Sequence, residues 1–201
     1  MADSEHPPPN PDSATRARIL DVAEQLFGER GYNSVRLRDI ADQLGIKHAA
    51  LYYHFPQKKE GLFVEVMTRS FNRHRAGMDA AIAQAGPDLR AQLLAVAAWL
   101  FDQPPVNMGR IMYSDLAAIS AANATAISLH MFDALRLPVE TALEATQTAG
   151  ITAVPDPGLA AISFVSLIET VHIVPALGNP AAKMQVIENT VDMLLQGWLK
   201  R

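Results

Sequence analysis

Apolar side chains recur every three or four positions along most of this chain, a period that predicts helices rather than strands. The first stripe begins at Ser13 or Thr15, ends near Gly31, and consists of Ile19, Val22, Ala23, Leu26 and Phe27. A second, shorter stripe is formed by Leu37, Ile40, Ala41 and Leu44. Gly45 ends that helix, because a left-handed backbone costs little only for glycine.

A third helix is predicted from about Lys47, since Leu51 and Phe55 are four positions apart and face one way, and Pro56 ends it. Two short helices joined by a glycine turn, after a longer helix that braces them, are typical of a helix-turn-helix. With Leu51 and Phe55 inward, the positions around the pair that face outward are basic, aromatic or small: Arg36, Arg38, Lys47, His48, Ala49, Tyr52, Tyr53 and His54.

The rest of the chain shows no strand-like alternation bounded by hairpin turns, so an all-α fold is predicted. Glycine and proline breaks place helices over residues 58–85, 88–102, 107–120, 122–149, 157–174 and 180–199. Asp156 and Asn179 each precede a proline and are predicted N-caps. The expected organisation is a proline-rich, disordered arm over residues 1–12, a helix-turn-helix domain over 13–57 and a larger helical domain over 58–201.

The last two predicted helices carry more apolar surface than one small body can cover. The helix over 157–174 is apolar nearly all round, and the helix over 180–199 has an apolar stripe at three- and four-residue spacing. We therefore expect a homodimer interface formed by a four-helix bundle. Its expected members are Leu167, Val171, Ile187, Val191, Leu194, Leu195 and Trp198.

Composition narrows the chemistry of the chain. The 201 residues include no cysteine, which excludes thiolate nucleophiles, cysteine-ligated metals and disulfide scaffolds. The net charge of −4 is unevenly divided, because residues 13–59 carry 8 Lys and Arg against 5 Asp and Glu, whereas residues 76–201 carry 6 against 11. A small cationic segment attached to an acidic body favours nucleic acid as the partner of the N-terminal part.

The sequence gives no indication of a membrane partner. The first twelve residues carry acids but no Lys or Arg, and they lack the apolar run of a secretory signal, so a cytoplasmic location is expected. Residues 158–178 are long enough to cross a bilayer, but they include Glu169 and His172 and are interrupted at Pro175. This pattern favours a buried helix of a soluble protein.

The run from Thr15 to Leu62 resembles the N-terminal DNA-binding domain of the TetR family of bacterial transcriptional repressors. The resemblance lies in the LF-x₃-GY pattern of residues 26–32, the RDIA of 38–41, the LYYHF of 51–55 and the lysine at 58. Residues 76–201 have no motif of their own, and only their helical content and apolar C-terminal pair are similar to the family's ligand-binding and dimerisation domain.

The resemblance implies a role for each matched residue. His48 would read base edges, Arg38 could also reach the major groove, and phosphates would be held by Tyr52, His54 and Lys58. Arg36 departs from the family's usual Ser or Thr at the start of the second helix, and its charge could hold a phosphate instead.

Ala49–Ala50 also depart from the family, standing where a Gly or Pro and a small hydroxyl residue are common, so one phosphate contact would be missing. One short helix reads few base pairs, so a homodimer and a pseudo-palindromic duplex operator are expected together. The competing interpretation of Tyr52 and Tyr53 is packing on the neighbouring helix, and that of His48, Lys58 and Lys59 is ordinary solvated surface.

Large, adaptable apolar side chains in the middle of the chain are expected mainly in the core, with some lining an effector cavity. The candidates are Trp99, Met108, Met112, Tyr113, Met131, Phe132 and Phe164. Glu169 and His172 are three apart and could orient a polar end of the effector, form hydrogen bonds in the interior or at an interface, or contribute to a metal site. The other ligands of such a metal are not placed by the sequence, so no metal and no cofactor is assigned.

These observations predict a sequence-specific transcriptional regulator, a repressor that a small apolar effector releases from its operator. Two alternatives remain open. The chain could be a constitutive DNA-binding protein without an effector, although an acidic, apolar body is more than DNA binding alone requires. It could also be a helical enzyme, but no nucleotide-binding, nucleophile or metalloprotease motif occurs in the sequence.

Overall fold

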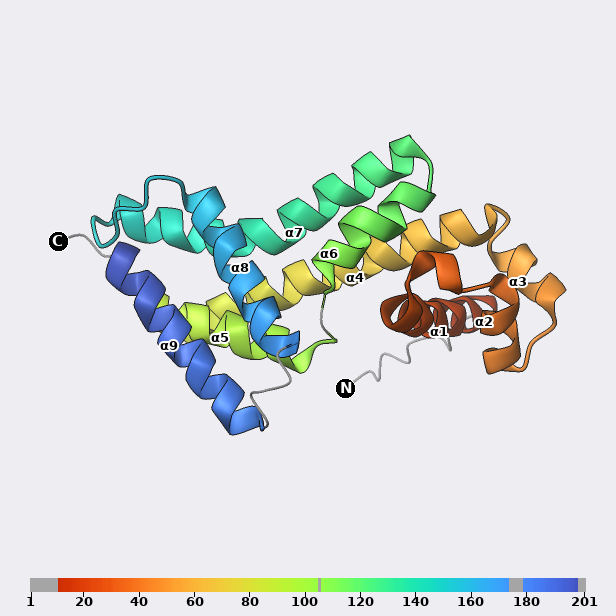
Figure 1. Ribbon diagram of the computed structural model, residues 1–201, viewed down its shortest axis with the longest axis horizontal. Coiled ribbons are helices and arrows are strands. Elements are labelled where there is room, and N and C mark those ends of the chain that lie inside the picture. The colour runs from red at the N-terminus through yellow and green to blue at the C-terminus, as the bar shows by residue number, and fades with distance from the viewer. Residues whose placement is uncertain (1–10, 105, 174–178, 199–201) are drawn as a thin grey trace, which may run out of the picture. The chain divides into compact units, whose positions relative to one another are not determined.

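The computed structural model describes residues 11–104, 106–173 and 179–198, and its long elements are all helices (Figure 1). The predicted all-α class is therefore confirmed. In chain order the elements are α1 Pro11–Ser34, α2 Leu37–Leu44, α3 His48–His54, α4 Lys58–Ala85, α5 Leu89–Asp102, α6 Met108–Arg110, a π-helix η1 Ile111–Asp115, a 3₁₀ helix η2 Leu116–Ala118, α7 Ala121–Thr148, α8 Pro157–Ile173 and α9 Pro180–Trp198.

The first helix begins slightly earlier than the apolar stripe indicates. Proline suits the first helical position, where its missing N–H has no intrahelical partner anyway, and Asp12 adds an acid to the first turn. The helical path is broken at Gly31, whose φ of 77° and ψ of 166° are not helical. The expected disordered arm falls, up to residue 10, outside the described residues.

The segment over 107–120 differs from the single regular helix that its composition predicts. A short α-turn is followed by η1, in which the turn widens, and then by the tighter η2. The Asp115 carboxylate in η1 accepts the backbone N–H of Tyr32 at 2.8 Å and lies 3.4 Å from Arg110 Nε. The apolar periodicity of a segment cannot predict contacts with residues so distant in the sequence.

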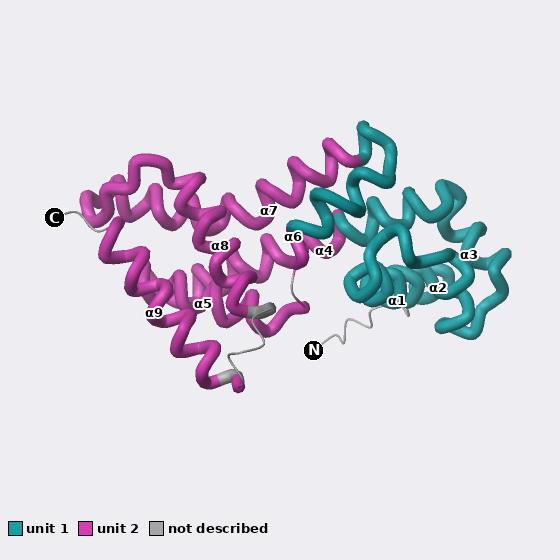
Figure 2. The backbone as a smooth tube through the Cα atoms, viewed as in Figure 1, with its two compact units in different colours: residues 1–67, 109–123 teal, residues 68–108, 124–201 magenta. Residues whose placement is uncertain are grey.

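The chain divides into two compact units, at other places than the domains expected from the sequence (Figure 2). Unit 1 comprises the described residues up to 67 together with 109–123, and unit 2 comprises 68–108 and the described residues from 124 onward. Helix α4 contributes its first ten residues to unit 1 and the remainder to unit 2.

The core of unit 1 is built from the stripes that the sequence shows. Ile19, Ile40 and Leu51 are fully buried, and α1 packs on α2, which packs on α3. An aromatic group adds to this core, since the Phe63 ring lies 5.1 Å from that of Phe27 and 4.9 Å from that of Tyr32. Helix α3 is thus fixed to the rest of unit 1 through one face.

Unit 2 has its own core, in which α5, α8 and α9 pack against one another. Its most deeply buried side chains include Leu93, Phe164 and Ile187. The predicted N-caps are present, since Asp156 Oδ1 accepts the N–H of Leu159 and Asn179 Oδ1 accepts that of Ala182, each at 2.8 Å. No helix among the described residues has the length and apolarity needed to cross a membrane.

Candidate nucleic-acid interface

The turn between α2 and α3 directs one face of α3 outward. Gly45 adopts the left-handed conformation (φ 66°), and the N–H of Ile46 donates to the Ala41 carbonyl at 3.0 Å, which closes α2. Leu51 is fully buried and Phe55 is 4% exposed, so these two residues hold α3 to the body of unit 1. The opposite face of α3 is left to solvent.

That outward face carries ring and hydrogen-bonding groups, as the sequence predicts. Lys47, His48 and Ala49 are exposed, and the Tyr52 and Tyr53 side chains are 41% and 73% exposed. The His48 ring lies edge-on to that of Tyr52 at 4.9 Å, and the His54 ring, which is half-buried, lies in the same way 5.2 Å from that of Tyr53. The exposure of both tyrosines argues against their packing on a neighbouring helix.

Two exposed arginines lie at the start of α2. Arg36 is the exposed N-cap of α2, and its backbone N–H donates to Asp39 Oδ2 at 2.8 Å. Asp39 therefore supplies one half of a capping box, and the Arg36 side chain makes no cap hydrogen bond. The exposed Arg38 side chain lies 3.5 Å from Asp42 in a surface ion pair, which is weak enough to open toward another anion.

Lys58 follows the end of α3 in an uncommon backbone conformation. Its φ of 60° is the only positive value at a non-glycine residue among the described residues. Its N–H donates to the carbonyl of Phe55, the C-cap of α3, at 3.0 Å, and its side chain is exposed. The tight turn thus places a lysine at the N-terminus of α4, where the helix dipole also attracts anions.

Sequence reasoning missed Arg16, which braces α3 without lying on it. Its guanidinium pairs with Glu65 of α4 at 2.5 Å and lies 4.9 Å from the centre of the Phe55 ring. One side chain of α1 thereby contacts the end of α3 and a residue of α4. Arg16 lies outside the apolar stripe of its helix, so no periodic signal in the sequence indicates such a role.

Lys59 also has a partner that the sequence did not indicate. Its Nζ lies 4.0 Å from the centre of the Tyr32 ring, and burial lowers the pKa of Lys59 against the opposing effect of Asp115 and Asp39. The backbone N–H of the same Tyr32 donates to the Asp115 carboxylate. Lys59 is therefore part of the packing of unit 1, whereas the Lys58 side chain is open to a ligand.

Glu60 ties the start of α4 to the start of α7 within unit 1. Its Oε1 accepts hydrogen bonds from the Ser120 backbone N–H at 3.0 Å, the Ser120 hydroxyl at 2.6 Å and the Asn123 amide at 2.7 Å. These donors lower the pKa of Glu60. Glu60 thus binds at the N-terminus of a 28-residue helix, which continues into unit 2.

The residues expected in an effector cavity are not all in one compact unit. Phe164 and Met131 are buried in unit 2, Met108 is half-buried, Phe132 is 45% exposed beneath the Arg136 guanidinium, and Trp99 lines a pocket between α4 and α5. Met112 and Tyr113 belong to unit 1 and are 43% and 89% exposed. The side chain of His172 lies outside the described residues.

Glu169 is buried in α8, with 7% of its surface exposed, and its Oε2 accepts the N–H of Val106 at 2.7 Å. Burial raises the pKa of Glu169 to about 7, against the lowering effect of that hydrogen bond. No group of three His, Asp or Glu side chains suited to a metal ion occurs in the described part of the chain.

The residues expected at a dimer interface have two different environments. Ile187 and Val191 are fully buried within the chain, and Val171 and Leu195 are each 7% exposed. Leu167 is 38% exposed, and Leu194 and Trp198 are half-buried. Leu159 of α8 and Met193 of α9, which are 63% and 59% exposed, are not among the residues that the sequence places at the interface.

Two family models match this chain. The model of bacterial regulatory proteins of the tetR family matches residues 19–66, which include α2, α3 and most of α1. The model of the AefR-like transcriptional repressor C-terminal domain matches residues 87–198, more than half of the chain.

Two curated relatives align with parts of this chain. The transcriptional repressor KstR2 of Rhodococcus jostii is 39% identical over 94 residues, 45% of each chain. The negative transcriptional regulator IcaR of the biofilm operon icaADBC in Staphylococcus aureus is 52% identical over 42 residues, 21% of this chain and 23% of that one. The chain thus aligns with less than half of the length of either relative.

Solved structures share the fold over almost the whole chain. A tetR-family regulatory protein from Rhodococcus RHA1 has a TM-score of 0.69 at 23% sequence identity. The match covers 90% of this chain and 95% of the Rhodococcus chain. A putative transcriptional regulator from Saccharomonospora viridis, solved in complex with choline, has a TM-score of 0.72 at 20% sequence identity. The match covers 94% of this chain and 100% of the Saccharomonospora chain.

Proposed function

The chain belongs to the TetR family of bacterial transcriptional regulators, with an AefR-like C-terminal domain, and we propose that it is a homodimeric repressor which a small molecule releases from a pseudo-palindromic operator. DNA binding and transcriptional regulation come with the family, and enzymatic activity is not its role. Two curated relatives are a repressor and a negative regulator, which supports repression as the direction of control.

The observation that carries this proposal is the outward face of α3, which presents exposed rings on a helix held by Leu51 and Phe55, with exposed Lys and Arg side chains on the segments before and after it. In the proposed complex, His48 and Arg38 contact base edges in the major groove. Tyr52, His54, Lys58 and Arg36 contact phosphates, with Lys47, Ala49 and Tyr53 at the same surface. Phosphate contacts supply affinity and register, while base contacts supply the sequence preference.

Dimerisation is proposed through the exposed apolar side chains of α8 and α9. Leu159 and Leu167 are eight positions apart on α8 and so share a face, and Met193 is exposed on α9. Exposed apolar side chains in this number favour burial against a second copy. The fully buried Ile187 and Val191 would support that surface from within the chain.

Release by a small molecule is supported by the organisation of unit 2. Its helices enclose apolar side chains together with one buried carboxylate, that of Glu169, and a regulator of the same fold was solved with choline bound. An effector with an apolar body and one polar or cationic group would suit such an interior. Because α4 and α7 each belong to both units, a ligand that shifts either helix would alter the DNA-binding unit.

The test is selection of DNA from a random duplex pool by the purified protein. Repeated rounds should enrich a pseudo-palindrome whose half-sites lie about one helical turn, or a multiple of it, apart. A thermal-shift screen then identifies stabilising small molecules, and these should lower the affinity for the selected duplex. Failure to enrich any sequence would contradict sequence-specific regulation, and ligands that bind free and DNA-bound protein equally would leave a constitutive DNA-binding protein.

A further inference from the structure

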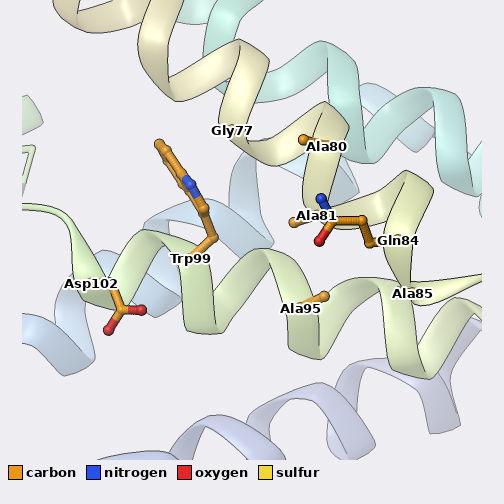
Figure 3. Close-up of a pocket in the computed structure, with 8 residues that line it drawn as sticks. All are labelled: Gly77, Ala80, Ala81, Gln84, Ala85, Ala95, Trp99 and Asp102. Atoms are coloured by element: carbon orange, nitrogen blue, oxygen red, sulfur yellow. The ribbon is translucent and has the colours of Figure 1, made fainter.

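A pocket of about 490 Å³ lies in unit 2 between the C-terminal half of α4 and the facing side of α5 (Figure 3). Its volume is within the range of small-molecule sites. Helix α4 contributes Gly77, Ala80, Ala81, Gln84 and Ala85, and α5 contributes Ala95, Trp99 and Asp102. Because Ala80, Gln84 and Asp102 are exposed, the pocket is open to solvent.

The pocket exists because most of the facing residues are glycine or alanine, and Trp99 is the one aromatic residue among those that line it. In Figure 3 the Trp99 side chain extends from α5 toward α4 near Gly77, with the alanines further along α4. A Cβ on Gly77 would lie 2.0 Å from both Cε2 and Cζ2 of Trp99. The indole therefore lies directly against the α4 backbone, and only glycine at position 77 permits this.

A second ring holds the indole in place. The buried His74 ring lies edge-on to Trp99, with 5.4 Å between ring centres and 85° between planes. His74 Nδ1 lies 2.8 Å from the carbonyl of Ser70, which fixes the orientation of that imidazole. Trp99 is thus a preorganised wall of the pocket and not a surface side chain that must be ordered by a ligand.

The charges at the pocket favour a cation. Asp102 is one turn after Trp99 at the C-terminal end of α5, and no Lys or Arg lines the pocket. The Asp102 carboxylate makes no ion pair or hydrogen bond with any other described residue. The partial negative charge of the helix C-terminus adds to that of the carboxylate, and the face of an indole also attracts cations.

We propose that this pocket binds a small organic cation, an alkyl- or arylammonium ion, with its charge near Trp99 and Asp102 and its apolar part against the alanines of α4. This inference rests on the proposed function and names the chemical class of the effector and a site for it that does not include Glu169. An anion would be repelled at Asp102, and a neutral apolar molecule would gain nothing from the carboxylate.

The position of the pocket also gives the ligand a route to DNA binding. A molecule between α4 and α5 contacts both helices, and α4 is continuous from this pocket to Lys58. Filling the space between the two helices changes their separation, and half-sites on DNA tolerate little change in the spacing of the two copies of α3.

The binding test uses benzyltrimethylammonium and, as a neutral molecule of similar size, N,N-dimethylbenzamide. The chain has two tryptophans, so in a Trp198→Phe background the fluorescence reports Trp99 alone. The ammonium ion should change this fluorescence saturably, and the amide should bind about tenfold more weakly. Equal affinity for the two probes, or no binding of the ammonium ion, would overturn the proposal.

Two variants with the same change of charge locate the site. Asp102→Asn should weaken ammonium binding about threefold and reduce its salt dependence, as expected for an exposed carboxylate. Glu144→Gln, at an exposed position of α7 that does not line the pocket, should leave binding unchanged. Equal binding by wild type and Asp102→Asn would place the cation elsewhere and overturn the assignment.

A third variant tests the wall itself. Gly77→Ala should displace the indole of Trp99 and shift its emission. Because the indole is retained but moved away from the cation, the variant should weaken binding of the ammonium ion more than binding of the neutral amide. Unchanged emission and unchanged binding would contradict the role of Trp99.

Failure of this site and failure of the proposed function give different results. If a screened molecule of another class releases the selected duplex while the ammonium ion does not bind, the cation site is wrong and the repressor function stands. If the ammonium ion binds in an Asp102-dependent way but the protein selects no DNA sequence, the proposed function is wrong and the site stands. Both are supported if the ammonium ion lowers DNA affinity in wild type and less so in Asp102→Asn.

Discussion

Single residues at two places in the chain are held in states that cost free energy. Burial favours the neutral form of Glu169, whose pKa is raised from 4.5 to about 7. Lys58 occupies the left-handed region with φ of 60°, which costs about 1 kcal/mol for a residue with a Cβ. Each cost leads to a prediction about stability.

The first prediction concerns the pH dependence of unfolding. The unfolded state ionises Glu169 from pH 4.5 upward, whereas the folded state does so only near pH 7, so folding stability falls between these values and is constant above them. Between pH 5 and pH 8, the free energy of unfolding of wild type should fall by about 2–3 kcal/mol relative to that of Glu169→Gln. Urea unfolding at fixed protein concentration measures this difference.

Glu144→Gln is the matched control, because Glu144 is exposed. Its free energy of unfolding should follow that of wild type at both pH values. A Glu169→Gln variant with the same pH dependence as wild type would show that Glu169 ionises normally in the folded protein.

The second prediction separates the backbone cost at position 58 from the function of its side chain. Lys58→Gly should be at least as stable as wild type and about 1 kcal/mol more stable than Lys58→Ala, because glycine adopts positive φ without a Cβ clash. Both variants should bind DNA equally weakly, since both lack the ammonium group. If Lys58→Gly retained wild-type DNA affinity, the side chain would not contact phosphate.

Elements in this chain are fixed partly by periodic patterns and partly by single contacts between distant segments. The apolar stripes with Gly45 and Pro56 predict α2 and α3, and the breaks at Gly86 and Gly150 predict the ends of α4 and α7, because these signals are local. The π-helix η1 could not be predicted. Its contacts join Asp115 to Tyr32 and Arg110 to the Phe27 carbonyl, and Gly31 leaves room for the carboxylate.

In the candidate nucleic-acid interface and the pocket, too, local patterns predict some residues, whereas others depend on contacts between distant segments. The outward residues of α3 follow from the inward position of Leu51 and Phe55, so the sequence predicts them. Arg16, Glu60 and the Gly77–Trp99 contact depend on which helices meet, which no single stripe encodes. For the same reason, the sequence did not show that Met112 and Tyr113 belong to unit 1.

The third prediction is that Arg16 positions α3 and does not bind phosphate. Arg16→Met keeps the aliphatic stem but removes the interactions with Glu65 and with the Phe55 ring. DNA affinity should fall while the dependence of affinity on salt keeps the slope of wild type, because every phosphate remains neutralised as before. A slope reduced by about one would instead mean that Arg16 meets a phosphate.

Glu65→Gln provides the partner variant for a double-mutant cycle. The Arg16 and Glu65 side chains are 44% and 34% exposed, so their coupling energy in folding stability should be only about 0.5 kcal/mol. If Arg16→Met loses more DNA affinity than Glu65→Gln, the difference between the two losses is due to the interaction of Arg16 with Phe55.

The whole molecule is proposed to act as a dimer through α8 and α9. Leu167→Asp should give a folded monomer in light scattering, because Leu167 is 38% exposed, whereas its neighbour Ile168, which is 1% exposed, belongs to the core of the chain. The control is Leu129→Asp on α7, where the leucine is 62% exposed and outside the proposed interface. A stable Leu167→Asp dimer that binds DNA as wild type does would exclude this surface.

In the proposed complex, the exposed side chains of unit 1 have different roles, because Lys58 contacts phosphate whereas His48 contacts base edges. The most direct measurement is the affinity of wild type, Lys58→Ala, His48→Ala and the control Arg75→Ala for the selected duplex and a scrambled one over a range of salt concentrations. Lys58→Ala should weaken binding to both duplexes and reduce the salt slope by about one for each phosphate that is no longer neutralised. His48→Ala should weaken only the selected duplex, by about 1–3 kcal/mol for each base that is no longer read, and Arg75→Ala should change neither. If Lys58→Ala and His48→Ala each reduced the affinity for both duplexes equally, Lys58 and His48 would not have the different roles proposed for them.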